Sequence, residues 1–303
     1  MKRDIPTKVI FGVAVIIGSL FVSQSILGAT VTSSVTVTNA APVVSAVSVN
    51  GGSAITLTAN TTTSVSVIAT ISDNNGCTDV TNGTTTILLY RNGVTSSTCL
   101  TTPNNLNCYL LTAFTATSTC AGTSANTTST FALQYFAQAT DASSSFSGQG
   151  WRATVIFKDP SNATGTADSA TTTLNTTLAI NVTTSSVNYG SLAPLSTSPV
   201  SSTTVANAGN SSSTLQLSAQ PTLTSGANVI TTSSQHYATS SFSYGVSDQL
   251  LSGVGTTVSG FTLTAPTTTT PVAKDIFWAL QVPSGQVTGA YSGTNVFTAV
   301  FVP

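Results

Sequence analysis

Hydrophobic and polar residues alternate with a period of two along most of the chain. In the stretches 64–73, 131–141 and 151–159, one set of alternate positions is apolar up to a final aspartate. A period of two places such a set on one face of a β-strand. Valine and threonine, whose branched side chains suit a pleated surface, are frequent in these stretches. The pattern therefore predicts an all-β chain.

The alternation also predicts which side chains face the interior. In the stretch 151–159 the polar positions opposite the apolar face are Arg152, Thr154 and Lys158. The apolar faces of the first half consist of Val65, Val67, Ala69, Ile71, Phe131, Leu133, Tyr135, Ala137, Trp151, Ala153, Val155 and Phe157. In the second half the expected core residues are Leu215, Leu217, Ile276, Trp278, Leu280 and Val282.

Turn motifs separate the predicted strands at short intervals. NGG, DNNG, RNG, SGQG and DPSN all combine residues that favour tight turns. Closely spaced strands of this kind are typical of antiparallel β-sandwiches. A chain of this length suits two such domains, so we predict sandwiches at 42–177 and 178–303, with 30–41 as a strand or linker before them.

The first 29 residues have the pattern of a secretory signal peptide. Lys2, Arg3 and Lys8 precede the apolar run 9–22, and small residues follow up to Ala29. We expect cleavage after Ala29. The alternative is an uncleaved membrane anchor, which would be the protein's only contact with a membrane.

Serine and threonine dominate the composition, with 59 Thr and 44 Ser, whereas only 5% of residues are charged. Glutamate is absent, and after Ala29 four basic residues face seven aspartates. Such a chain has no electrostatic footprint for nucleic acid and no polybasic patch for a membrane surface. Its many apolar and β-branched residues also argue against a disordered stalk.

The four cysteines are Cys77, Cys99, Cys108 and Cys120. Structural zinc sites usually bring ligands in close pairs, and no C-x-x-C pair occurs here. The only histidine, His236, lies far from them. An even, clustered set therefore predicts two disulfides, with three pairings left open. Disulfides persist outside the reducing cytosol, so we expect a secreted or cell-surface protein.

Several motifs carry a resemblance to known surface proteins. PVVSAVSVNGG, SVSVIATISDNNGC, QYFAQATD and W-x-A-x-V resemble an immunoglobulin-like module of prokaryotic surface proteins. VNYGSLAP, TTVANAGN and GAYSGTNVFTAVF resemble the sandwich domains of secreted surface and fibre proteins, a group that includes TasA-like fibre subunits. The resemblance implies β-sandwich folds, although the cysteines do not match the single inter-sheet bridge of antibody domains.

Catalytic motifs are missing from the sequence. His236 is the only histidine and lies in a polar stretch that reads as a loop or edge strand, so we expect it to be exposed or hydrogen-bonded. Neither the G-x-S-x-G elbow nor the D-T-G and D-S-G motifs of aspartic proteases occur. We therefore expect no enzymatic activity and no organic cofactor.

Aspartates in two loops offer oxygen ligands for calcium. Asp73, Asn75 and Asp79 fall in SDNNGCTD, and Asp159 and Asp168 fall in FKDPSNATGTAD. In an immunoglobulin-like arrangement both loops lie at one end of the sandwich, so a Ca²⁺ ion between them is geometrically feasible. The alternative is that these residues only form turns by bonding their own backbone.

The stretch 29–39 alternates apolar and small polar residues, with Val31, Val35 and Val37 on one face. A free strand of this kind can complete the sheet of a neighbouring molecule. The alternative is an ordinary first strand or linker of the first sandwich.

The expected function is a non-catalytic structural protein, secreted or on the cell surface. One alternative is a filament or surface-layer subunit that assembles through the N-terminal strand. Another is an adhesin or carbohydrate-binding module in which Trp151 and Tyr291, near loop ends, stack on sugars. The expected partners are further copies of the chain or other surface components.

Overall fold

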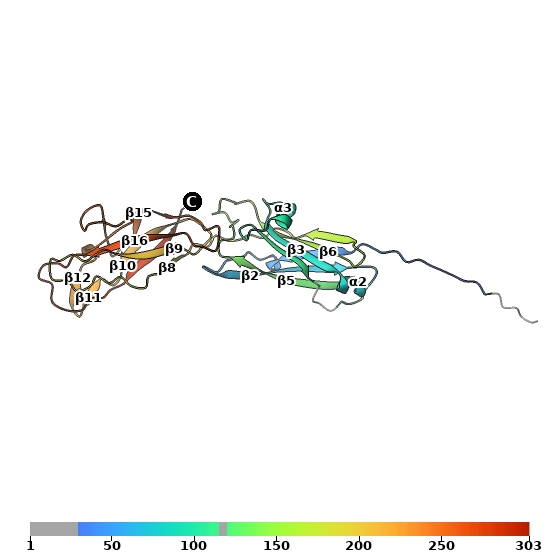
Figure 1. The fold of residues 1–303 in the computed structure, drawn as a ribbon, viewed down its shortest axis with the longest axis horizontal. Coiled ribbons are helices and arrows are strands. Elements are labelled where there is room, and N and C mark those ends of the chain that lie inside the picture. The colour runs from blue at the N-terminus through green and yellow to red at the C-terminus, as the bar shows by residue number, and fades with distance from the viewer. Residues whose placement is uncertain (1–29, 115–119, 303) are drawn as a thin grey trace, which may run out of the picture. The chain divides into compact units, whose positions relative to one another are not determined.

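The computed structural model describes residues 30–114 and 120–302 of the chain. The chain divides into two compact units, Met1–Thr38 and Asn39–Pro303. The predicted signal peptide, residues 1–29, lies outside the described residues. None of the helices in the described part is long and apolar enough to cross a membrane. The second unit consists mainly of strands in antiparallel sheets, so the predicted all-β class is confirmed (Figure 1).

The first half of this unit is a sandwich of two antiparallel sheets. One sheet has the order β1-β2-β5, and the other has the order β4-β3-β6-β7. The strands are β1 Val43–Val49, β2 Thr62–Ser72, β3 Thr84–Arg91, β4 Cys108–Phe114, β5 Ser124–Gln134, β6 Trp151–Lys158 and β7 Thr164–Asp168. Figure 1 shows β2 beside β5 and β3 beside β6, as their pairing requires.

The apolar side chains at alternate positions of the two sheets pack into one core between the sheets. Val65 pairs with Phe131 and Ile71 with Ala125 across β2 and β5, and all four side chains are buried. Every residue of the predicted apolar faces is buried, including Trp151, whose exposure is 0%. Because burying one large apolar side chain contributes about 1.5–3 kcal/mol, this face-to-face core is the main source of stability for the first sandwich.

The outer face of the second sheet is covered, which the alternation did not predict. Tyr90 of β3 forms an apolar cluster with Cys99 and Cys108, and Cys99 belongs to helix α3, Ser96–Thr101. Thr154 of β6 lies opposite the apolar face, as the alternation places it, yet it is only 4% exposed. Its Oγ1 lies 2.9 Å from Tyr90 Oη and donates to Asp168, so neighbouring side chains on this outer face bury it.

Short helical segments interrupt the strands. They are η1 Asn50–Gly52, α2 Cys77–Asn82, α3 Ser96–Thr101 and η2 Thr232–Ser234. Six residues, the length of α2 and of α3, make fewer than two helical turns, so no helical period is visible in the sequence. Thr95 caps α3, since its Oγ1 accepts a hydrogen bond from Thr98 N at 3.2 Å.

The second half of the unit forms another sandwich. Its sheets have the orders β14-β13-β16-β9-β8 and β15-β10-β17, and a separate hairpin joins β11 to β12. The strands are β8 Ile180–Val182, β9 Ser201–Asn207, β10 Ser213–Ala219, β11 Leu223–Ser225, β12 Asn228–Ile230, β13 Gln235–Ala238, β14 Gln249–Leu250, β15 Thr256–Leu263, β16 Ala273–Leu280 and β17 Asn295–Phe301.

The core of the second sandwich contains most of the expected residues. Leu215, Leu217, Ile276 and Trp278 are fully buried within one apolar cluster, and Leu280 and Val282 are buried outside it. The first core ends at Leu174, and the first residue packed on the second is Ile180. The predicted boundary between residues 177 and 178 falls between these two cores.

Candidate functional site

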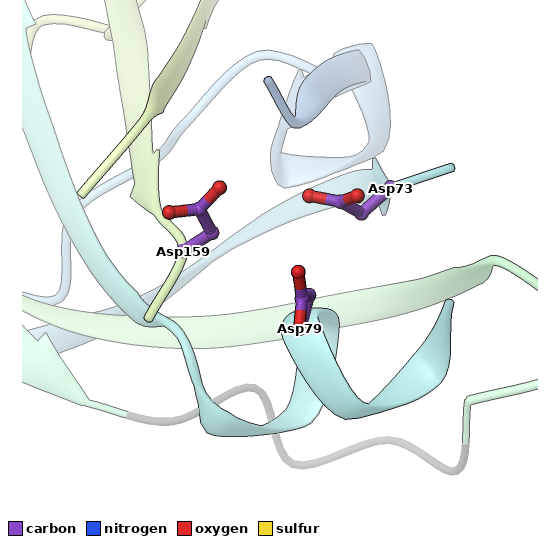
Figure 2. Close-up of side chains that lie close together, drawn as sticks. All are labelled: Asp73, Asp79 and Asp159. Atoms are coloured by element: carbon purple, nitrogen blue, oxygen red, sulfur yellow. The ribbon is translucent and has the colours of Figure 1, made fainter. Parts of the chain in front are cut away.

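Three aspartates of the first sandwich lie close together. Asp73 directly follows β2, Asp159 directly follows β6, and Asp79 belongs to α2. One carboxylate oxygen of each residue lies within 4.8 Å of the others. Figure 2 shows the three carboxylates directed toward a common space. The two loops that the sequence placed at one end of the sandwich therefore bring these carboxylates together. We call this group the aspartate cluster.

The two buried members of the aspartate cluster differ in their hydrogen bonding. Asp159 is 3% exposed, and its oxygens accept hydrogen bonds from Ala163 N and from Asn39 Nδ2, each at 2.8 Å. Asp73 is 2% exposed, and its Oδ1 accepts the backbone N–H of Asn75 at 2.8 Å. Asp73 Oδ2 is buried and has no hydrogen-bond partner among the described residues. Folding therefore removes this oxygen from water without replacing the lost hydrogen bonds by a donor from the described residues.

The other candidate ligands have different partners. Asn75 Oδ1 accepts a hydrogen bond from Ala40 N at 2.6 Å, so this side chain holds the backbone where the first sandwich begins. Asp168 is the last residue of β7, where it forms an ion pair with Arg152 and accepts a hydrogen bond from Thr154. Asp168 therefore lies outside the aspartate cluster.

The four cysteines form two disulfides, as predicted. Cys77 is bonded to Cys120 and Cys99 to Cys108, with Cα–Cα distances of 5.6 and 5.5 Å. The structure thus selects one of the three pairings that the sequence left open. Because Cys77 is the first residue of α2, the first disulfide also anchors the helix that carries Asp79.

The N-terminal segment is extended and solvent-exposed. Val31, Val35 and Val37 are 86%, 88% and 80% exposed, and residues 30–38 belong to no strand. The interpretation of this stretch as the first strand of the first sandwich is wrong, because that strand is β1, Val43–Val49. The role of the three valines in assembly stays a prediction.

A cavity of about 800 Å³ opens in the second sandwich. Tyr291 lines it, together with Tyr189 and Leu223, and the Tyr291 hydroxyl donates to Val287 O at 2.8 Å. Burial raises the pKa of Tyr189 well above its usual value, so this phenol stays neutral. The expectation that Trp151 stacks on sugars is wrong, since its ring is fully buried in the first core.

His236 is neither on a loop nor exposed. It lies in β13, which is flanked by β14 and β16, and it is 8% exposed. Its Nδ1 lies 2.7 Å from Asp248 Oδ2, and its ring stacks on Tyr244 with 3.9 Å between centroids. Burial alone would raise the pKa of the Asp248 carboxyl, but hydrogen bonds from His236 and from Gly245 N–H outweigh it and lower that pKa. No sequence motif marks this pair.

Comparisons with known proteins were made for the whole chain. No family model matches it, and no curated protein matches it. Among solved structures, it is similar to a chain of the CsuC–CsuE chaperone–tip adhesion subunit pre-assembly complex from archaic chaperone-usher Csu pili of Acinetobacter baumannii. The identity is 12% and the TM-score 0.35, and the match covers 82% of this chain and 97% of that one.

Two further similarities involve longer chains. Dimeric latent PorU from Porphyromonas gingivalis matches with 12% identity, a TM-score of 0.25 and coverage of 82% of this chain and 24% of PorU. Red sea bream transglutaminase matches with 9% identity, a TM-score of 0.21 and coverage of 85% and 31%. This chain thus spans less than a third of either protein. Scores this low support no functional conclusion, and the likeness to TasA-like subunits stays a prediction.

Proposed function

We propose that this protein is a non-catalytic structural component of a cell surface or of secreted material, in which β-sandwich modules act as rigid spacers. One observation carries the proposal: all four cysteines are joined in disulfides within the first sandwich. Such bonds persist in oxidising compartments and are rare in the cytosol. A location outside the cytosol therefore fits the chemistry on which this fold depends.

The outward faces of the strands support a structural rather than a catalytic role. In β5 the exposed positions include Thr128 and Thr130, while Phe131 and Leu133 point inward. Short hydroxyl side chains keep such a surface hydrated, and with 5% charged residues the chain has little electrostatic attraction for charged ligands. His236 is held by Asp248 and Tyr244, which leaves it a packing role in this proposal.

The test is the location and intact mass of the native protein in cells that produce it. We expect it in the envelope or medium, cleaved after Ala29, with a mass lowered by the hydrogens that the two disulfides release. A cytosolic protein with four reduced thiols and an uncleaved leader would contradict the proposal. A hydrolytic activity that disappears in a His236→Ala variant would contradict its non-catalytic part.

A second candidate function is that of a filament or surface-layer subunit. The observation that favours it is the exposure of Val31, Val35 and Val37, which share one face of an extended segment. An extended segment with apolar residues at alternate positions can add a strand to an open sheet edge. We propose that its acceptor is a second copy of this chain.

The acceptor edge in this second candidate is β17, which, among the described strands, pairs only with β10 and lies at the edge of its sheet. A cavity of about 260 Å³ lies beside it, lined by Phe297 of this strand together with Val187 and Tyr189. Most of the cavity wall is polar, and these three side chains provide apolar contact for the incoming valines. A head-to-tail contact of this kind extends into a filament if it does not close into a ring.

Light scattering and electron microscopy of the oxidised protein test this assembly. We expect polymers from the wild type and monomers from the triple variant Val31→Thr, Val35→Thr, Val37→Thr, because threonine keeps the β-propensity but removes apolar contact. A matched control replaces Val229 and Val254, two exposed valines of the second sandwich, with threonine. Monomeric wild-type protein, or equal polymerisation of all three proteins, would exclude the filament function.

A carbohydrate-binding module is the remaining candidate, and the cavity of about 800 Å³ that Tyr291 lines is the observation that favours it. Tyrosine rings at such a surface can pack against the apolar faces of sugars. A glycan array with the wild type and a Tyr291→Ala variant tests this function. Glycan binding should weaken in the variant, and a wild type that binds no glycan would reject the module.

A further inference from the structure

The aspartate cluster concentrates negative charge without a basic partner. The ion pairs among the described residues are Arg152–Asp168 and His236–Asp248, so none of them involves Asp73, Asp79 or Asp159. Carboxylates that share a desolvated space repel one another unless a cation is present or a proton is taken up. Within the described part of the chain, no positive charge therefore balances the aspartate cluster.

Asp73 Oδ2 gives an independent indication of a missing ligand. Asp73 is 2% exposed, and no donor in residues 30–114 or 120–302 reaches this oxygen. Burying a carboxylate oxygen without a partner is costly, so such atoms in folded proteins usually bind something. In Figure 2 the Asp73 carboxylate points into the space that Asp79 and Asp159 also face. The carboxylate that carries the unsatisfied oxygen thus faces the place where a cation would neutralise all three residues.

We propose that Asp73, Asp79 and Asp159 bind one Ca²⁺ ion. Calcium binds oxygen ligands at about 2.3–2.6 Å, so two oxygens on one ion cannot lie much more than about 5 Å apart. The three carboxylate oxygens lie within 4.8 Å of one another, which meets this condition. Zinc would prefer nitrogen or sulfur ligands, and the nearby Cys77 is held in a disulfide. Backbone carbonyls and water complete the six to eight ligands that calcium takes.

The ion would join three separate segments of the first sandwich: the end of β2, helix α2 and the loop after β6. Asp159 also holds the side chain of Asn39, at the point where this sandwich begins. Calcium would therefore stiffen this end of the first sandwich and fix the residues from which the N-terminal segment extends. This role goes beyond the proposed structural function and does not depend on it.

Calorimetric titration of the oxidised, EDTA-treated protein with CaCl₂ tests the site. We expect one Ca²⁺ per chain with a Kd of about 10⁻⁴–10⁻³ M, the range of extracellular calcium modules. At roughly 10 mM Ca²⁺, the unfolding temperature that Trp151 fluorescence reports in a Trp278→Phe background should rise by several degrees. Sodium chloride at the same ionic strength should not reproduce this rise, because a bound ion acts differently from charge screening.

Asp73→Asn is the sharpest variant, because it keeps the shape of the side chain and removes its charge. In EDTA it should unfold at the same temperature as the wild type or a higher one, since carboxylate repulsion is relieved. In calcium it should unfold below the wild type, with a Kd weakened at least about tenfold. Asp168→Asn is the matched control: it removes a carboxylate of the same sandwich from outside the aspartate cluster and should leave the Kd unchanged.

Three outcomes would overturn the proposal. The first is an absence of saturable calcium heat together with equal unfolding temperatures in EDTA and in calcium. The second is a stabilisation that sodium chloride reproduces. The third is an Asp73→Asn variant that is destabilised equally in EDTA and in calcium, because Asp73 would then have only a packing role.

Discussion

The Cys77–Cys120 disulfide should contribute more to stability than the Cys99–Cys108 disulfide, because it closes a much longer loop. The sequence separations are 43 and 9 residues. In the chain-entropy model, loops of these lengths correspond to about 4 and about 2.6 kcal/mol of unfolding free energy at 25 °C. We therefore expect reduction of the longer link to cost about 1.4 kcal/mol more than reduction of the shorter one.

Packing must be separated from the cross-link, because Cys99 and Cys108 are buried whereas Cys77 and Cys120 are only partly buried. Two variants achieve this: one has Cys99 and Cys108 replaced by alanine, and the other has Cys77 and Cys120 replaced. Each variant keeps one disulfide and is compared with its own reduced form. The difference between oxidised and reduced protein then reports that cross-link alone.

Urea unfolding provides the measurement, and the two tryptophans assign it to a domain. Trp151 is buried in the first core and Trp278 in the second. With Trp278→Phe as background, Trp151 fluorescence follows the first sandwich, and Trp151→Phe gives the converse. Because a cut cross-link lets the unfolded chain expand, free energies extrapolated to water must be compared rather than midpoints.

Two results would refute this reasoning. If reducing Cys99–Cys108 cost as much as reducing Cys77–Cys120, loop length would not determine the stabilisation. If reduction shifted the transition that Trp278 reports, the disulfides would not act on the first sandwich alone.

Other predictions concern single side chains, each measured by urea unfolding. Asn210→Ala should lower the unfolding free energy by about 2–3 kcal/mol. The reason is that the buried Asn210 amide donates to Ala137 O at 3.0 Å and accepts from Thr177 N at 2.7 Å. A loss below about 0.5 kcal/mol would contradict this prediction. Gly83→Ala should cost about 1–3 kcal/mol, since a Cβ there would overlap both the Phe157 ring and the backbone oxygen of Lys158, and unchanged stability would contradict this. The fold lowers the pKa of the Asp248 carboxyl below its ordinary value of 3.8. The ionised carboxylate therefore stabilises the fold above that ordinary pKa, and this stabilisation is lost as the pH falls through the lower pKa of the folded state. The unfolding free energy that Trp278 fluorescence reports should therefore fall below about pH 4, and it should fall less in the Asp248→Asn variant. If the wild type and the variant lost stability in parallel as the pH fell, this role of Asp248 would be refuted.

Much of the fold could be predicted because its signals are local. Alternation identified the buried faces of β2, β5 and β6, and turn residues identified the breaks between strands. A strand's period of two is a property of its own backbone, so neighbouring residues reveal it without knowledge of the partner strand. The short helices escaped prediction because α2 and α3 are too short to display a period.

The candidate site was only partly predictable. The turn-like loops identify Asp73, Asp79 and Asp159 as candidate calcium ligands. The loop sequences do not reveal that Asp73 Oδ2 lacks a hydrogen-bond donor among the described residues. The His236–Asp248 pair was missed because a histidine and an aspartate separated by 12 residues form no motif, and only the pairing of β13 with β14 brings them together. The position of Trp151 near a loop end suggests a ligand surface, but its neighbours in sequence do not reveal that the ring is fully buried.

The sequence by itself determined the β-class of this chain, the presence of two disulfides and the aspartate-rich ends of two strands, because composition and short-range order specify each of them. The tertiary structure alone decided which cysteines join, which strand is covered on both faces and which carboxylates meet. Asp73 and Asp159 lie at the ends of strands in different sheets. Their proximity depends on how the two sheets pack. That packing is determined by contacts among residues far apart in the chain, so no short stretch of sequence encodes it.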